Sequence, residues 1–284
     1  MSTSLESFKS YIGKSEHAAD VVTAAAMLKI AAALGLKNPA SAKGDPIPPG
    51  WYGAFFPPSH GPSQMRADGQ PSGGGIAPPI PLPRRRLGGV RMSFHEPLRI
   101  GDEIARVTEI ADVQIDEDAS GATVVVIERN NISNGRGRAV VEERDLIYLS
   151  AERAAQKPAA PAAPGQAVWR RVIEPSPVLL FRFSAIRYNS HRIHYDRDYV
   201  TQVEKLPGLV VQGTLVSQLL IEMCRGELPG RQIASFSYQA SRQIYDTGPF
   251  TIAGAPAADG RGAALWALDP DGNLAMTATA KFAG

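Results

Sequence analysis

The chain has 284 residues, of which 44% are hydrophobic, and a formal net charge of +2. That length suits one large or two ordinary domains and is enough to bury a sizeable core. The nearly balanced charge gives no overall argument for binding nucleic acid or an acidic membrane surface. A single cysteine, Cys224, excludes an internal disulfide framework and suits a reducing compartment.

The N-terminal part contains the most apolar stretch of the chain, Val21–Leu36. Lys29 interrupts this stretch, which is too short to span a bilayer comfortably. The residues before it lack the apolar core of a secretory signal. We therefore expect a cytoplasmic protein with no membrane or nucleic-acid partner. Asp20 is a plausible N-cap for a helix over Val21–Leu34, which Gly35 would end.

Residues 57–83 are rich in proline and glycine, which predicts a long irregular loop of the kind that is functional or mobile. An aromatic cluster that includes Trp51 precedes this loop, and a basic cluster that includes Arg85 and Arg91 follows it. The aromatic residues suit core packing, or alternatively a wall around a substrate. The arginines suit a solvated face. Alternatively they could contact phosphates or a carboxylate, because a guanidinium group binds either anion.

Both halves of the chain predict a helix followed by antiparallel strands. Strands of the first half are expected near Val90–Phe94, Glu103–Val113, Thr123–Ile132 and Arg138–Leu149. Residues 151–166, rich in Ala and Pro, predict a linker between a first half, 1–150, and a second half, 167–284. Helices of the second half are expected from Ser176-Pro177 to about Ala185 and over Thr214–Leu228. Its strands are expected near Gln232–Gln243, Phe250–Ala255, Ala263–Leu268 and Leu274–Phe282.

The stretch from 183 to 213 concentrates the residues that can carry chemistry. His191 and His194 lie five residues or fewer after Asn189, and Gly213 begins the second apolar helix. A histidine can move a proton near neutral pH. A glycine N–H at the positive end of a helix can stabilise an oxyanion. Together these groups predict action on a carbonyl substrate.

The segment FSAIRYNSHRIHYD followed by GLVVQGTL resembles the hydratase motif of the MaoC-like (R)-specific enoyl-CoA hydratases and dehydratases. The family pattern is Asp-x-Asn-x-x-His followed by a glycine-led helix. Asn189 in the first place and His191 in the third resemble the branch of 3-methylfumaryl-CoA hydratases and 3-hydroxyacyl-thioester dehydratases. PPGWYGAFFPP, GGGIAPPIPLPRRRLGGVRMSFHEPLRIGDE and VVEERDLIYL also look like that branch, so the resemblance covers roughly 45–282.

The resemblance implies an α+β fold of two hot-dog halves, in which the first half is degenerate and shapes the substrate tunnel and the second half is catalytic. It also implies a homodimer by family analogy. It implies no metal and no cofactor, since CoA arrives as part of the substrate.

Within this family, His194 would be the general base or acid, and the Gly213 N–H would hold the charge on the thioester oxygen. Asn189 stands where most relatives have Asp and cannot accept a proton, so it would orient the water. The candidate substrate contacts are His191, Gln212, Arg187, Arg85, Arg91 and Trp51.

The expected reaction is the reversible addition of water across the double bond of an enoyl-CoA. The branch resemblance and the nearby arginines favour a dicarboxylic substrate such as 3-methylfumaryl-CoA. One alternative is a 3-hydroxyacyl-thioester dehydratase of fatty acid synthesis. Another is a non-catalytic acyl-CoA-binding protein, in which Asn189 would mark lost activity.

Overall fold

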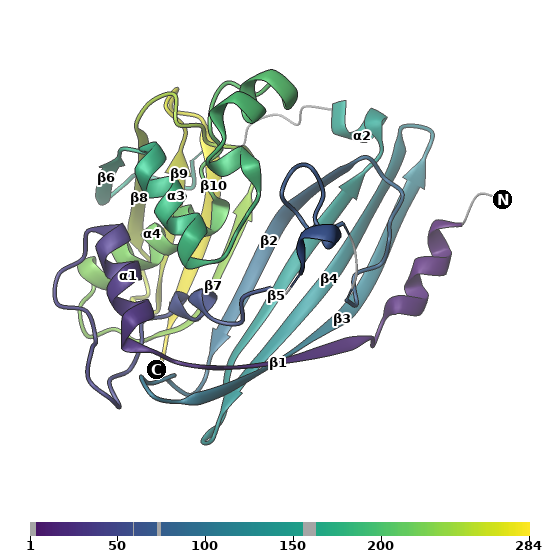
Figure 1. The fold of residues 1–284 in the computed structure, drawn as a ribbon. Coiled ribbons are helices and arrows are strands. Elements are labelled where there is room, and N and C mark those ends of the chain that lie inside the picture. The colour runs from purple at the N-terminus through teal and green to yellow at the C-terminus, as the bar shows by residue number, and fades with distance from the viewer. Residues whose placement is uncertain (1–3, 59, 73–74, 156–162) are drawn as a thin grey trace.

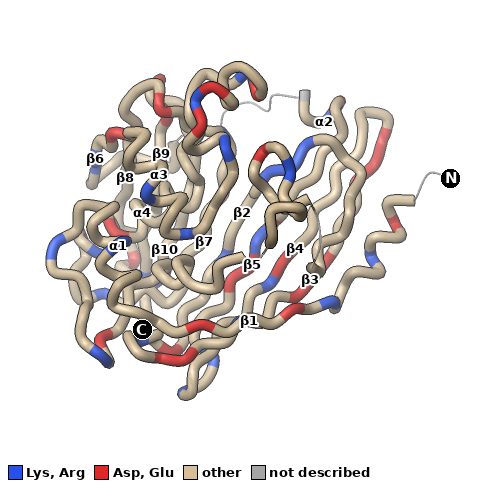
Figure 2. The backbone as a smooth tube through the Cα atoms, viewed as in Figure 1, with Lys and Arg blue, Asp and Glu red and all other residues tan. Residues whose placement is uncertain are grey.

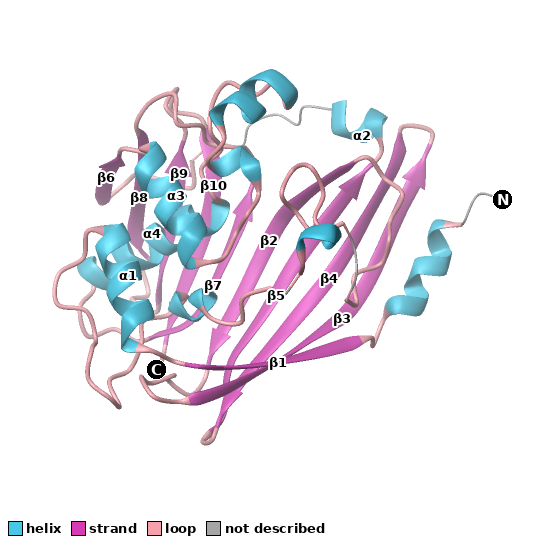
Figure 3. Ribbon diagram, viewed as in Figure 1, coloured by secondary structure: helices cyan, strands magenta, loops and turns pink. Residues whose placement is uncertain are grey.

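The computed structural model describes residues 4–284 except 59, 73–74 and 156–162, and its described part contains one antiparallel sheet of ten strands. Figure 1 shows the helices α1, α3 and α4 gathered over one part of the sheet, and Figure 3 shows the strands running side by side across the molecule. The strands are β1 Ser15–Val21, β2 Arg84–Phe94, β3 Glu103–Asp118, β4 Gly121–Asn134, β5 Gly137–Leu149, β6 Trp169–Ile173, β7 Ile233–Ala240, β8 Phe250–Pro256, β9 Gly262–Leu268 and β10 Leu274–Phe282.

Four α-helices and several short helical turns complete the described structure. The α-helices are α1 Ala24–Leu34, α2 Ala151–Ala155, α3 Pro177–Ile186 and α4 Gly213–Glu227. The short turns are η1 Leu5–Tyr11, η2 Trp51–Ala54, η3 Pro62–Gln64, η4 Arg192–His194 and the π-helical η5 Tyr199–Val203. None of the described helices is long and apolar enough to cross a membrane.

The strand order β1-β3-β4-β5-β2-β7-β10-β9-β8-β6 keeps the first five strands at one end of the sheet and the last five at the other. The two sets meet where β2 pairs with β7, from Gly89–Gln239 to Ser93–Ser235. Side chains from both halves therefore converge near this junction. Within the predicted linker, α2 occupies the beginning and residues 156–162 lie outside the described part, so the division at 151–166 stays a prediction.

Helix α4 forms the centre of the core. Nine of its 15 residues are buried, more than the single stripe that a helix on a protein surface buries. It contacts β7, β8, β9 and β10, which surround it. Burial of such apolar surface is the main favourable contribution to folding, at roughly 25 cal/mol per Å². The start of α4 is consequently held at a defined place inside the sheet.

The predicted helices and strands are confirmed except near the two edges of the sheet. Asp20 is not the N-cap of α1: it lies in β1, and its carboxylate accepts a hydrogen bond from the Phe56 N–H at 2.7 Å. Thr23 caps the helix instead, with its side-chain oxygen accepting from the Ala26 N–H at 3.3 Å. The edge strands β1 and β6 were not predicted, because their exposed residues lack a hydrophobic alternation.

Candidate active site

His194 lies in the turn η4, between α3 and α4, and its side chain is buried. Its Nδ1 is 2.7 Å from the carbonyl oxygen of Val210. Since a carbonyl can only accept, Nδ1 carries the proton and Nε2 presents a lone pair. Burial, together with the neighbouring His191, lowers the pKa of His194 to about 4, although the bond to Val210 opposes this change. The imidazole is therefore neutral at physiological pH and able to accept a proton.

His191 packs against His194, with ring centroids 5.5 Å apart in an edge-to-face arrangement. The Nε2 atom of Gln70 lies 3.0 and 3.1 Å from the two ring nitrogens of His191. Burial, with further contributions from Arg66 and Arg85, lowers the pKa of His191 to about 4, while Asp68 opposes this. Two adjacent neutral imidazoles avoid the repulsion that two cations would suffer at this distance.

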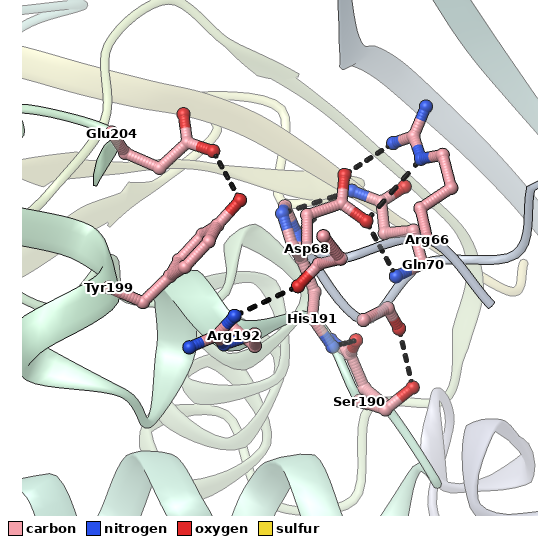
Figure 4. Close-up of polar contacts among 11 residues, drawn as sticks. Arg66, Asp68, Gln70, Ser190, His191, Arg192, Tyr199 and Glu204 are labelled. Atoms are coloured by element: carbon pink, nitrogen blue, oxygen red, sulfur yellow. Dashed lines mark hydrogen bonds and ion pairs between the residues drawn. The ribbon is translucent and has the colours of Figure 1, made fainter. Parts of the chain in front are cut away.

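A loop of the first half holds the histidine segment in place (Figure 4). The Ser190 hydroxyl donates to the Gly69 carbonyl at 2.6 Å. The Arg192 N–H donates to the Asp68 carbonyl at 2.9 Å, and the Arg192 guanidinium donates to the Ala67 carbonyl at 3.0 Å. These bonds join segments that are more than one hundred residues apart in the chain. The first half is thus part of the site.

Asn189 is positioned by the way that α3 ends. The Asn189 N–H donates to the Ser184 carbonyl at 2.8 Å, and the Tyr188 N–H donates to the Ala185 carbonyl at 3.2 Å. This is a Schellman motif, and Tyr188 takes its left-handed position with φ +50°, where glycine is usual. The side-chain oxygen of Asn189 accepts from the His191 N–H at 3.1 Å. Its amide NH₂ is the part that can donate to a water molecule.

Gly213 is the first residue of α4, so its N–H is one of those that have no partner within the helix. The helix dipole makes this end attractive to negative charge. A Cβ built on Gly213 would meet only the Met276 Cε, at 3.8 Å. The glycine therefore leaves open space in front of the helix N-terminus, which an acceptor oxygen could occupy.

Gln212 and Trp51 stabilise the structure around the site. The Gln212 amide donates to the Leu180 carbonyl at 2.9 Å and to the Ser184 hydroxyl at 2.8 Å. These bonds fasten α3 to the start of α4. The indole of Trp51 donates to the Glu222 carboxylate at 2.7 Å, on the middle of α4. Tyr52, next to Trp51, lines a cavity beside α4.

The three candidate arginines lie in different places. Arg85 faces the helix side of the sheet, where it lies over the Tyr148 ring and near His191. Arg91 points to the opposite face, because the side chains of Val90 and Met92 on either side point inward. There it pairs with Glu143 and Asp145, at 3.1 and 2.7 Å. The prediction that Arg91 contacts substrate at this site is contradicted by that orientation.

The outer face, where Arg91 lies, carries mixed charges. Figure 2 shows acidic and basic residues interspersed along β3, β4 and β5. Arg129 pairs there with Glu109 and Glu143, at 2.9 and 2.8 Å. Exposed pairs of this kind contribute about 0–1 kcal/mol each. This face is a solvated ion-pair network.

Arg187 faces inward and lines a cavity beside the first turn of α4, together with Tyr52, Glu142 and Arg144. Arg187 is a substrate contact predicted from the sequence, and Tyr52 belongs to the predicted aromatic cluster. Glu142, Arg144 and Gln70 were not predicted to belong to the site. Glu142 and Arg144 alternate with outward-facing Glu143 on β5, so the strand period gave a usable signal for them. Gln70 had none, since only the folded loop brings it to His191. Among the described residues, no three His, Cys, Asp or Glu side chains are grouped to hold a metal ion.

Gly69 provides a test of the contact between the two loops. Its φ is +81°, and a Cβ would lie 2.0 Å from the Ser190 carbonyl oxygen. We expect Gly69→Ala to lower the free energy of unfolding by about 1–2 kcal/mol from backbone strain, and by about 1–3 kcal/mol more from the clash. Gly230, with φ +85° and no heavy atom within 4 Å, is the matched control. Urea unfolding would measure the free energy of unfolding of both variants. An equal decrease for Gly69→Ala and Gly230→Ala would contradict a tight contact between Gly69 and Ser190.

Three comparisons place these observations among known proteins. The family model for hydroxyacyl-thioester dehydratase type 2 matches residues 50–246. The chain is 37% identical over 276 residues to the mesaconyl-C(4)-CoA hydratase of Chloroflexus aurantiacus, covering 96% of this chain and 97% of that protein. It is 28% identical to the mitochondrial hydroxyacyl-thioester dehydratase type 2 of Schizosaccharomyces pombe, covering 72% and 77%.

A solved structure identifies the architecture. A conserved hypothetical protein of Mycobacterium tuberculosis, described as having a double hotdog fold, matches with a TM-score of 0.51 at 13% identity. The match covers 95% of this chain and 96% of that one. The predicted α+β double hot-dog fold is thereby confirmed, with a helix-centred sheet in which two sets of strands join edge to edge.

Proposed function

The chain belongs to the hydroxyacyl-thioester dehydratase type 2 family, and from this we propose that it reversibly hydrates an enoyl-CoA with a short dicarboxylic acyl group, such as 3-methylfumaryl-CoA. The observation that carries the proposal is the neutral His194, whose Nε2 is free to accept a proton while Val210 holds Nδ1. The similarity to a mesaconyl-C(4)-CoA hydratase over nearly the whole chain supports this choice of substrate class.

In the proposed reaction, His194 removes a proton from water as the water oxygen bonds to C3 of the enoyl group. The electron pair of the double bond moves onto the thioester, and the Gly213 N–H stabilises the resulting oxyanion. The imidazolium then gives the proton to C2, which completes the addition of one water molecule. Its lowered pKa makes this imidazolium a strong acid for that final step.

Asn189 cannot act as a second base, because an amide does not take up a proton at these pH values. Its oxygen is already held by the His191 N–H, so its NH₂ group would order the attacking water. Gln70 and Arg85, from the first half, would line the entry to His191, where the guanidinium suits the CoA phosphates. We propose that the first half contributes binding and the second half contributes proton transfer.

The test is a panel of enoyl-CoA substrates, followed by loss of the absorbance of the conjugated thioester. We expect faster hydration of 3-methylfumaryl-CoA than of crotonyl-CoA or a longer linear enoyl-CoA. Turnover of the linear chains alone would assign the protein to fatty acid synthesis instead. Binding of CoA thioesters without any turnover would identify a binding protein and contradict the proposal.

We also propose that the protein is a cytoplasmic homodimer. The resemblance to hot-dog proteins, which commonly pair, supports the dimer. The single cysteine, Cys224, is buried and free, which suits a reducing compartment. Sedimentation velocity would detect the dimer as twice the 30.3 kDa chain mass, and a single species at the chain mass would contradict it.

A further inference from the structure

A cavity of about 30 Å³ lies between the first turns of α4 and the strands β2, β5 and β7. One water molecule needs about 10–15 Å³ of such space, so the cavity can hold two waters or the two oxygens of a carboxylate. Its lining includes two arginines, Arg144 and Arg187, but only one acidic residue, Glu142. We call this cavity the arginine pocket.

The single carboxylate of the arginine pocket is already engaged. The Arg144 Nε lies 2.5 Å from one Glu142 oxygen, and the Tyr52 hydroxyl donates to the other. Burial alone would raise the pKa of Glu142, but Arg144, Tyr52 and Arg187 together lower it. Glu142 is therefore an anion that balances one arginine. One positive charge remains in excess in the pocket.

That excess charge belongs to Arg187. No described acidic side chain lies within 4.0 Å of its guanidinium, in contrast to Arg144. Burial and the like charge of Arg144 lower the pKa of Arg187, as expected for a cation without its own counterion. Its guanidinium occupies the space that a side chain at Gly53 would fill, with Nη1 1.8 Å from the position of that Cβ. The glycine thus makes room for the arginine.

A second group in the pocket also lacks a partner. The Tyr238 hydroxyl is buried and has no hydrogen-bond partner among the described residues. A buried hydroxyl without a partner costs about 1–3 kcal/mol by mutational measures, so structures usually satisfy it with protein, water or ligand. Tyr238 lines the pocket together with Arg187. An unpaired donor and an unpaired cation therefore share one small space.

The arginine pocket adjoins the proposed catalytic groups. Arg187 precedes Asn189 by two residues, and the pocket residue Thr214 directly follows Gly213. Consecutive Cα atoms are about 3.8 Å apart. In a butenedioyl thioester, three carbon–carbon bonds separate the thioester carbon from the free carboxylate carbon: two single bonds of about 1.5 Å and the shorter double bond between them. With its thioester at the Gly213 N–H, such a substrate would have its free carboxylate within reach of the pocket, which begins at the next residue, Thr214.

We propose that the arginine pocket binds the free carboxylate of a short dicarboxylic acyl-CoA, with Arg187 as its ion-pair partner and Tyr238 as a hydrogen-bond donor. This inference rests on the proposed function and names the residues that select its substrate class. A linear enoyl-CoA would leave Arg187 and Tyr238 unpaired. Sites with polar groups built for one ligand reject an analogue that lacks the matching group.

The direct test is equilibrium binding of succinyl-CoA and butyryl-CoA, which differ by a carboxylate in place of a methyl group and cannot be hydrated. Wild type should bind succinyl-CoA more tightly. Arg187→Leu should weaken succinyl-CoA binding by about 10- to 100-fold and leave butyryl-CoA binding within about twofold. Arg91→Leu, on the opposite face, should change neither. The assignment of Arg187 as the carboxylate partner would be overturned if wild type bound both ligands with equal affinity. It would also be overturned if Arg187→Leu lost the same factor of affinity for both.

Tyr238→Phe is a second variant that removes only the hydroxyl and keeps the packing. It should weaken succinyl-CoA binding several-fold without changing butyryl-CoA binding, even if Arg187→Leu does not fold. If Tyr238→Phe lost the same factor of affinity for both ligands, the arginine pocket would not be the carboxylate site. Because neither ligand reacts, this result is independent of turnover. Selective binding without hydration of any enoyl-CoA would contradict the proposed function while supporting the pocket.

Discussion

His194→Asn should lower kcat/KM for enoyl-CoA hydration by about 100- to 10,000-fold, the usual contribution of a general base. Asparagine can still donate from its amide to the Val210 carbonyl, as Nδ1 does now at 2.7 Å. It offers no basic nitrogen in place of Nε2. Steady-state kinetics with 3-methylfumaryl-CoA would measure the loss. His95→Asn, at an exposed histidine after β2, is the control and should retain full activity. A loss under tenfold in His194→Asn would mean that another group moves the proton.

The same histidine should set the acid limit of the enzyme. Only its neutral form accepts a proton, so kcat/KM should stay level at neutral pH and fall as the pH drops through about 4. The pKa of His194 in the folded protein is lower than the ordinary histidine value of 6.5. The corresponding stability, about 3 kcal/mol, is therefore present above pH 6.5 and lost as the pH falls from 6.5 to 4. An activity limb near pH 6.5 would contradict burial of this histidine in the free enzyme.

Gly213→Ala should produce a protein that is slightly more stable but much less active. Alanine suits a helix better than glycine by about 0.4–1 kcal/mol, and its methyl group would meet only Met276, at 3.8 Å. The methyl group would nevertheless occupy the space in front of the N–H that the thioester oxygen needs. Loss of one oxyanion donor costs about 100- to 1,000-fold in kcat.

Kinetics and thermal unfolding on the same Gly213→Ala preparation separate these two effects. Gly226→Ala is the matched control, because it lies on the exposed last turn of the same helix, near only the Arg171 guanidinium. It should raise stability and leave kcat unchanged. Full activity in Gly213→Ala would exclude the Gly213 N–H as the oxyanion donor.

The strands and the two main helices of the second half follow from local signals. Ser176 caps α3 as predicted, with its side-chain oxygen accepting from the Leu179 N–H at 3.2 Å, and Asp271-Gly272 lies in the turn before β10. Local signals failed where neighbours far apart in the chain decide the outcome. Both strands that were not predicted lie at the edges, where no buried face imposes an alternation.

The residues of the candidate site divide in the same way, into those that local sequence signals predict and those that depend on neighbours far apart in the chain. Asn189 and His194 follow from one short motif, but the correct arginine depends on which face of a strand it occupies. Arg91 and Arg144 belong to adjacent strands, yet they point to opposite faces, because Arg144 pairs across the sheet with Val90. A shift of one residue reverses the face of every side chain in a strand. Pairing of β2 with β5 fixes that choice, and a single sequence does not display it.

The position of β10 in the sheet has a consequence for how the chain matures during synthesis. β10 is the last of the described strands to leave the ribosome, yet it lies between β7 and β9 rather than at an edge. The first five strands can pair as soon as they emerge, which leaves β2 as a temporary edge until β7 arrives. β7 and β9, two of the strands that contact α4, stay unpaired on one side until residues 274–282 have been made. A nascent chain that pauses before that point exposes strand edges of the kind that promote aggregation.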